Sequence, residues 1–308
     1  MSLLRTDLAR ILYDATHADV EYVFDEGISA VAQDSAGVHV RFEHGAPRRF
    51  DLLVGADGVH SNVRRLVFGP TERYLRDLGS YISLYTTTTE REHDGWRLMY
   101  TVPAGNGRPG RTAALYPKPE PGTALAGFFL RSEPLSYDRS DIDEQKRIVA
   151  RAFEGDAWEV PRMLAAIRDT PDFYFDRVVQ IEVDTWSRQR TVLLGGAGYC
   201  ASPMSGIGTS LALVGAYILA GELAAADGDH TVAYPTYQAR MRRFVDRAQE
   251  FARNSGDGGL MPDSRRRLWL RNQTIRTLRY LPRQLIGRGM EKVAHTVELD
   301  DHRIPAPH

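Results

Sequence analysis

Hydrophobic and polar positions alternate differently in successive parts of the chain. Between residues 3 and 18, apolar positions recur with the period of a helix, which predicts an amphipathic helix. The next segments alternate with period two or form short apolar runs bounded by glycines, and this pattern is typical of strands. These expected strands cover residues 20–24, 28–31, 38–42 and 48–54.

The middle of the chain is rich in β-branched and aromatic residues. Strands are expected at residues 81–89, 96–102, 112–116 and 124–130, with Pro- and Gly-containing loops between them. They predict an antiparallel sheet whose aromatic residues either line a pocket or form its core. Further expected elements are helices at 141–153 and 160–167, a strand at 171–183 and helical segments from 234 to 297.

Two strand-to-turn motifs carry the candidate chemistry. In residues 191–210 a β-branched strand runs into a glycine-rich loop that opens a long apolar helix, which predicts a seat for a flat cofactor. Upstream, a strand ending at Val54 leads into Gly55-Ala-Asp57-Gly58, which places a carboxylate where α/β sheets bind ligands. In the same motif, Ser61 can cap the next helical turn, and Arg64 can hold the loop or meet a phosphate.

Composition narrows the function class. A net charge of -1 and a pI near 6.8 give no reason to expect nucleic acid, so a small molecule fits better. The single cysteine, Cys200, excludes an intrachain disulfide, suits a cytoplasmic protein and is expected to be a small buried hydrophobe. Neither metal-ligand spacing nor a Gly-x-Ser-x-Gly motif is present, so we expect no metal site and no hydrolase triad.

The chain start shows no signal-peptide pattern, and no transmembrane segment is expected. The apolar run Leu211–Gly221 is shorter than the ~20 residues that a membrane span needs, so it predicts a buried helix of a soluble protein. Between residues 240 and 292, basic residues outnumber acidic ones. This basic stretch is either a docking face for an acidic partner or membrane, or an ordinary solvated helix face.

Together the two motifs resemble the FAD-dependent aromatic hydroxylases, the single-component flavoprotein monooxygenases. Arg5-Thr-Asp7-Leu8 also matches the Arg-x-Asp-Leu sequence of the related tetracycline-inactivating flavin enzymes. The resemblance implies an α/β fold with an incomplete FAD-binding Rossmann-like domain, an inserted antiparallel substrate sheet and a C-terminal helical tail. The expected domains are 1–78 with 171–230 (FAD-binding-like, first βαβ unit missing), 79–170 (substrate) and 231–308 (helical).

The resemblance also implies an activity, hydroxylation of an aromatic or polyketide-like small molecule with FAD, NAD(P)H and O₂. No fixed catalytic acid or base is demanded, because the protein's part is positioning and water exclusion. The implied flavin neighbours are Arg5, Asp57, Gly58, Arg64, Gly195, Gly196, Ala197, Pro203, Gly206, Ile207 and Gly208.

The sequence departs from the family pattern at three places. Gly196 replaces the usual aspartate, Ile207 replaces the usual glutamine, and no strand, Gly-x-Gly-x-x-Gly turn and helix are found in series. Loss of the aspartate contact could weaken FAD roughly ten- to a hundredfold. A flavin-free descendant that binds or cyclises a natural product, and a truncated or split flavoprotein, therefore stay open beside the monooxygenase. A homo-oligomer or a complementing N-terminal segment could cover the sheet edges left by the missing unit.

Overall fold

The computed structural model describes residues 5–89, 96–255, 260–278 and 299, and they fold into three sheets flanked by helices. An outer antiparallel sheet has the order β1-β2-β3, from Ile28–Gln33, Val38–Phe42 and Arg48–Phe50. A second, short sheet has the order β10-β11-β4, from Ser187–Arg188, Thr191–Leu193 and Leu53–Gly55. The third has the order β6-β7-β8-β5-β9, from Leu98–Val102, Arg111–Pro117, Thr123–Arg131, Leu75–Thr88 and Tyr174–Ile181.

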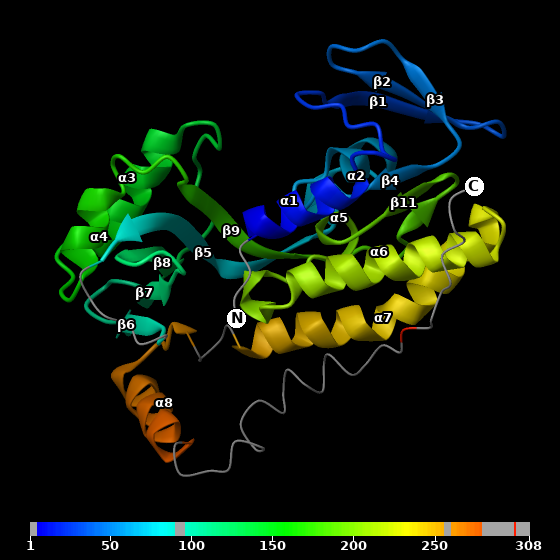
Figure 1. Cartoon of the computed structure of the whole chain (residues 1–308). Coiled ribbons are helices and arrows are strands. Elements are labelled where there is room, and N and C mark those ends of the chain that lie inside the picture. Colours follow the sequence, from blue (N-terminus) through cyan, green and yellow to red (C-terminus); the bar gives the residue numbers. More distant parts are fainter. Residues whose placement is uncertain (1–4, 90–95, 256–259, 279–298, 300–308) are drawn as a thin grey trace.

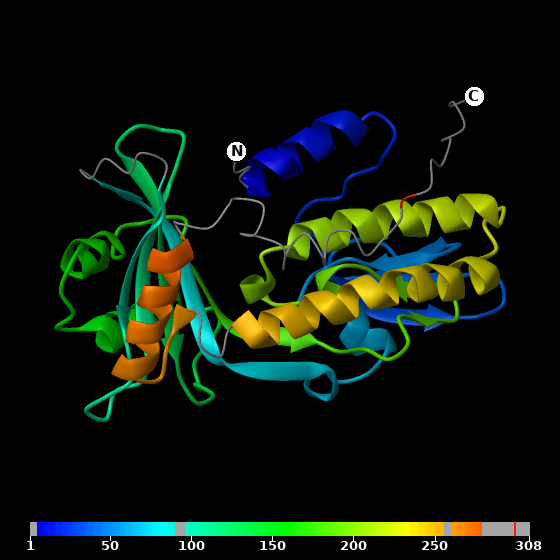
Figure 2. The same cartoon turned by 90° about the horizontal axis from the view of Figure 1, so that it is seen from below.

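The helices divide between the two ends of the molecule. The long helices α6 (Gly208–Ala225) and α7 (His230–Ser255) run side by side below the two small sheets (Figure 1). At the other end, α3 (Ile142–Phe153) and α4 (Val160–Ala166) cover one face of the five-stranded sheet, and α8 (Arg265–Leu278) covers the other (Figure 2). The short elements are α1 (Arg5–Thr16), α2 (Asn62–Val67), α5 (Gly196–Tyr199) and the 3₁₀ turns η1 (Thr71–Arg73) and η2 (Pro203–Ser205).

The described residues form three hydrophobic cores, and the smallest of them packs Met261 against Ile82 and Phe129 of the five-stranded sheet. One of the two larger cores packs β11, α5, α6 and α7 together around Trp186, Tyr199 and Tyr237. The other packs Tyr81, Tyr85 and Phe128 of the five-stranded sheet against α3 and α4. Since Tyr81, Tyr85 and Phe128 are each at most 1% exposed, these aromatic residues form sheet core and do not line an open pocket.

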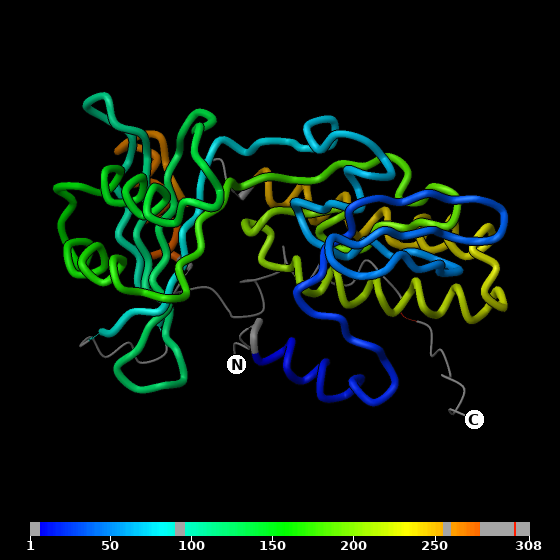
Figure 3. Tube along the Cα trace, turned by 90° about the horizontal axis from the view of Figure 1, so that it is seen from above, coloured from blue at the N-terminus to red at the C-terminus, as the bar shows by residue number. Residues whose placement is uncertain are grey.

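β5 and β9 connect the two ends. They pair antiparallel and run as one ribbon from the five-stranded sheet toward the end that holds α6, α7 and the two small sheets (Figure 3). The sheet therefore takes its last strand from residues 174–181, beyond the 79–170 segment assigned to the substrate domain from sequence.

The strand expected at residues 20–24 is not formed, and that prediction was wrong. The segment has no strand partner, and its aromatic side chains pack on α1 instead: Tyr22 lies 4.9 Å from Tyr13 between ring centroids, and Phe24 lies 6.2 Å from Tyr13. The strand expected at 48–54 is two strands, because the chain leaves the outer sheet after Phe50 and joins β11 from Leu53.

The apolar helix also differs from expectation. α6 has 18 residues because it begins at Gly208, and it is long and apolar enough for a membrane span by length and composition. Only five of its residues are buried: Leu211, Gly215, Ile218, Leu219 and Gly221. The prediction of a short, buried helix was therefore wrong on both points. In the tail, α7 and α8 confirm helices, and residues 279–298 lie outside the described part of the chain.

One stretch has the literal spacing of a dinucleotide motif, Gly105-Asn-Gly-Arg-Pro-Gly110. It forms the loop between the antiparallel strands β6 and β7, with Gly107 at φ +75°. Because this loop leads into a strand, its N–H groups do not open a helix, and it is not a phosphate-binding turn.

Candidate functional site

The two predicted motifs lie side by side on a pair of parallel strands. β4 pairs with β11 in the register Leu53↔Thr191, Val54↔Val192 and Gly55↔Leu193, so both strands end at the same edge. A Cβ on Gly196 would stand 3.3 Å from the Cα of Gly58. The turns that follow the strands are thus in backbone contact, as expected from the sequence.

Asp57 holds its own turn in place. Its carboxylate accepts hydrogen bonds from the Ser61 hydroxyl, from the Asn62 N–H at 2.7 Å and from the Val63 N–H at 3.0 Å. Ser61 in turn caps α2, since its Oγ accepts from the Arg64 N–H at 2.9 Å. The cap predicted at Ser61 is confirmed, and the Asp57 carboxylate is engaged by the start of α2.

Arg64 joins the two turns from behind. Its side chain is fully buried, and its guanidinium donates to the Ala197 carbonyl at 2.8 Å and to the Val59 carbonyl at 2.7 Å. Burial lowers the pKa of Arg64 below its ordinary value. Of the two roles the sequence allowed for Arg64, the structure shows loop support.

The second turn is built from residues that adopt left-handed backbone conformations. Gly195 has φ +61° and Gly206 has φ +68°, a region that side chains with a Cβ rarely enter. Between them, Ser202 has φ +79°, and its Oγ accepts from the Met204 N–H at 3.1 Å. Behind the turn, the Tyr199 and Tyr237 hydroxyls are hydrogen bonded at 2.8 Å in the core. The turn is therefore rigidly supported from the protein side.

The other side of this turn is open. Pro203, Gly206 and Gly208 are exposed, and a Cβ on Gly206 or Gly208 would meet no atom within 4 Å. The first N–H groups of α6 begin at this place, where the helix dipole favours negative charge. Ile207, which replaces the family's glutamine, is half-buried and packs against the core. This open, glycine-lined helix start fits the ring end of a flavin.

The remaining candidates are placed as follows. Ala197 is buried in α5. Arg5 is the first residue of α1, and the contacts of its side chain lie outside the described part of the structure. Cys200 is half-buried against the core beside β9. The two turns account only for the ring end of FAD. Among the described residues there is no third glycine turn between a strand and a helix that could bind the pyrophosphate.

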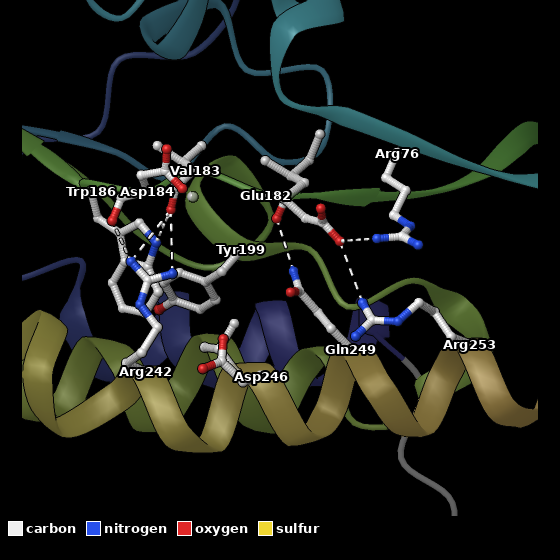
Figure 4. A pocket seen from close by; sticks show the side chains of 13 residues that line it. Arg76, Glu182, Val183, Asp184, Trp186, Tyr199, Arg242, Asp246, Gln249 and Arg253 are labelled. Atoms are coloured by element: carbon white, nitrogen blue, oxygen red, sulfur yellow. Dashed lines mark hydrogen bonds and ion pairs between the residues drawn. The ribbon is translucent and has the colours of Figure 1, made fainter.

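A polar cavity lies behind the second turn, between the end of β9 and α7 (Figure 4). It has a volume of about 340 Å³, and Tyr199 forms part of its wall. Three of its charged groups pair with one another, because Arg76 and Arg253 both lie 3.3 Å from Glu182. Arg242 stacks over Trp186 at 4.5 Å. We interpret the cavity as a structural junction and place the candidate cofactor site on the open side of the turn.

Sequence reasoning missed one residue of the first turn, His60. It contacts Asp176 of β9, which lies 116 positions later in the chain. No local pattern connects two residues so far apart, and a family alignment that follows both positions would be the signal to look for.

Comparison with known proteins agrees with this architecture, although no family model matches the chain. An uncharacterized protein of Mycobacterium tuberculosis is 43% identical over 259 residues, which are 84% of this chain and 68% of that protein. A flavin-dependent monooxygenase from an unknown prokaryotic organism is 33% identical over 303 residues, 98% of this chain and 74% of its own. The chain spans 63% of the flavin-dependent monooxygenase of Legionella longbeachae, with 38% identity.

Solved structures give the same answer. The crystal structure of the tetracycline destructase Tet(51) matches with a TM-score of 0.79 and 30% identity, covering 97% of this chain and 76% of that one.

Two glycine turns at the ends of paired parallel strands, joined to a five-stranded antiparallel sheet, define an α/β protein whose ligand-binding edge is expected at those turns. With the relatives above, the chain belongs to the FAD-dependent monooxygenases, a family of oxidoreductases.

Proposed function

We propose that this chain carries the flavin-ring and substrate portions of an FAD-dependent monooxygenase that hydroxylates an aromatic or polyketide-like small molecule, with NAD(P)H as reductant. The observation that carries the proposal is the contact between the Gly58 and Gly196 turns beside the exposed start of α6. When bound, FAD supplies the redox chemistry and activates O₂, which no side chain of this site can do.

The chain's own residues orient the flavin ring and shield the substrate from water. The first N–H groups of α6 stabilise negative charge at the edge of a flavin ring, and Gly206 and Gly208 leave room for the ring to approach. Asp57 and Arg64 fix the facing turn. The five-stranded sheet limits access of water to a substrate between it and the ring. The similarity to the tetracycline destructase Tet(51) supports a planar polycyclic substrate.

The test is titration of the purified chain with FAD, followed by flavin fluorescence and heat stability, and then NADPH oxidation with aromatic and polyketide probes that include tetracycline. We expect FAD to be bound and to raise the melting temperature. We also expect a probe to accelerate NADPH oxidation and to gain one oxygen atom by mass. Binding of FAD without oxygen transfer to any probe would leave the cofactor assignment standing and reject the substrate class.

A flavin-free function is the second candidate, and Gly196 and Ile207 favour it. Gly196 offers no carboxylate for a flavin, and the Ile207 side chain packs against the hydrophobic core. In that case the chain stays colourless and FAD does not stabilise it against heat, whereas a polyketide probe does.

A third candidate is a flavoprotein completed by a further segment, and the edge of β4 favours it. Among the described residues β4 pairs only with β11, and Val54 on β4 is 40% exposed. An unpaired edge of a parallel strand can accept another parallel strand. Here the N-terminal segment of the Legionella relative, added as a separate polypeptide, should bind the chain and tighten FAD, and no binding would reject this form.

A further inference from the structure

His60 ties the first turn to the substrate sheet. It follows Gly58 in the turn between β4 and α2, and its imidazole Nε2 lies 2.9 Å from Oδ2 of Asp176 on β9. The other ring nitrogen, Nδ1, contacts the guanidinium of Arg139, which belongs to the loop before α3. One side chain therefore joins its own turn to two segments that are distant in sequence.

The contacts fix the state of the ring. An arginine guanidinium can only donate hydrogen bonds, so Nδ1 of His60 must accept from Arg139. The proton then sits on Nε2, which donates to the Asp176 carboxylate. In this tautomer the imidazole is a directed bridge between a cation and an anion.

The Asp176 side chain is itself held in place by burial and by further hydrogen bonds. It is only 7% exposed, and it also accepts from the Arg177 N–H at 2.8 Å and from the Tyr174 hydroxyl at 3.2 Å. Burial alone would raise the pKa of Asp176, but the hydrogen bonds from His60 and from the Arg177 N–H, together with the charge of Arg139, hold it below its usual value. The carboxylate is therefore ionised at neutral pH and holds the imidazole.

The Arg139 end is also anchored. The Arg139 carbonyl accepts from the Gln145 side chain at 2.8 Å, and in the same loop the Leu135 N–H donates to the Tyr81 hydroxyl at 2.7 Å. Tyr137 of this loop lies 5.3 Å from Phe175 between ring centroids. The loop therefore packs on the sheet, so we expect Arg139 and the sheet to move together.

We propose that His60 is a positioning residue that holds the flavin-side turn in register with the substrate sheet through Asp176 and Arg139. Its consequence for cofactor binding and oxygen transfer rests on the proposed monooxygenase function. The bridge itself does not.

The variants separate hydrogen bonding from size. His60→Gln can still donate an amide N–H to Asp176 and accept from Arg139, whereas His60→Phe keeps a ring without either bond. Asp176→Asn removes the charge at the other end. His39→Phe is the matched control, because His39 forms an exposed pair with Asp34 at the same 2.9 Å distance inside the outer sheet.

The first measurement is hydrogen–deuterium exchange of the whole chain without cofactor. We expect His60→Phe and Asp176→Asn each to speed exchange roughly tenfold in both 58–67 and 132–141, as loss of a hydrogen bond to a charged group implies. His60→Gln and His39→Phe should leave both segments unchanged. Faster exchange in 58–67 alone would overturn the bridge.

The second measurement adds FAD, NADPH and tetracycline as probe. His60→Phe should weaken FAD and raise the share of NADPH oxidation that ends in hydrogen peroxide, and His60→Gln should restore both. A bridge confirmed by exchange with FAD affinity and peroxide share unchanged would overturn the positioning role. If the unmodified chain binds no FAD, the proposed function fails, and the exchange result still decides whether the bridge exists.

Discussion

Gly196 and Gly58 face each other across the two turns with no side chain between them. A Cβ on Gly196 would stand 3.3 Å from both the Gly58 Cα and the Val59 amide nitrogen, so the neighbouring backbone would have to give by a few tenths of an ångström. This position is where the family places an aspartate, and the absence of its side chain has a measurable consequence.

Gly196→Asp should tighten FAD roughly tenfold, because a carboxylate returns as a hydrogen-bond acceptor worth about 1–3 kcal/mol. Flavin fluorescence quenching measures the dissociation constant. Gly196→Ala adds the same Cβ without the acceptor and should bring no gain. Equal affinities of the two variants would show that the carboxylate is not what this site lacks.

Arg64→Met should destabilise the fold by about 3 kcal/mol, because the Ala197 and Val59 carbonyls lose their buried donor. Arg64→Lys should recover little, since one ammonium cannot reproduce two bonds from a planar fork. Urea denaturation followed by circular dichroism provides the measurement. Arg65→Met is the control because Arg65 is exposed, and a loss as large there would refute the assignment to Arg64.

Gly215→Ala should destabilise the protein by about 1–3 kcal/mol, because its Cβ would collide with the Tyr199 hydroxyl inside the core. In a Tyr199→Phe background the same substitution should cost less, since the colliding oxygen is gone. A double-mutant cycle by chemical denaturation measures this coupling. Gly208→Ala on the same helix meets no atom within 4 Å and should be nearly neutral. Strict additivity of the two core substitutions would contradict this packing.

Acid stability should depend on Asp77. Burial alone would raise the pKa of Asp77, but hydrogen bonds from Arg177 and from the Gly79 N–H lower it below its ordinary value. A lowered pKa contributes stability that is present above the pKa of the unfolded chain, about 4, and is lost as the pH falls through the folded-state pKa. Below about pH 4, the melting temperature of Asp77→Asn should therefore fall less steeply than that of the unmodified chain. In an Arg177→Met background this difference should shrink.

The sequence predicted what is local and missed what depends on partners. The turns after Val54 and Leu193 were predictable because glycines, a capping serine and flanking apolar strands lie within a few residues of one another. The family resemblance added that the turns share a sheet, and β4 and β11 confirm it.

The errors have a common cause. Residues 20–24 have strand-like composition, but no strand is available to pair with them, and the rings settle on Tyr13. The burial of α6 was overestimated because an apolar helix predicts a covering layer without showing whether one is present. His60 was missed because its partner, Asp176 of β9, lies 116 positions later in the chain. Each of these outcomes is set by tertiary contacts, which composition and period do not encode.

The ribbon of β5 and β9 has one irregular point, where the register shifts between Asp77 and Tyr81 and Gly79 adopts φ +65°. Regular ladder bonds resist bending, whereas a bulge leaves residues unpaired and lets a strand change direction. If the two ends of the molecule move relative to each other, the ribbon should therefore bend at this one point. The Asp77–Arg177 ion pair lies at that point and would resist the bending.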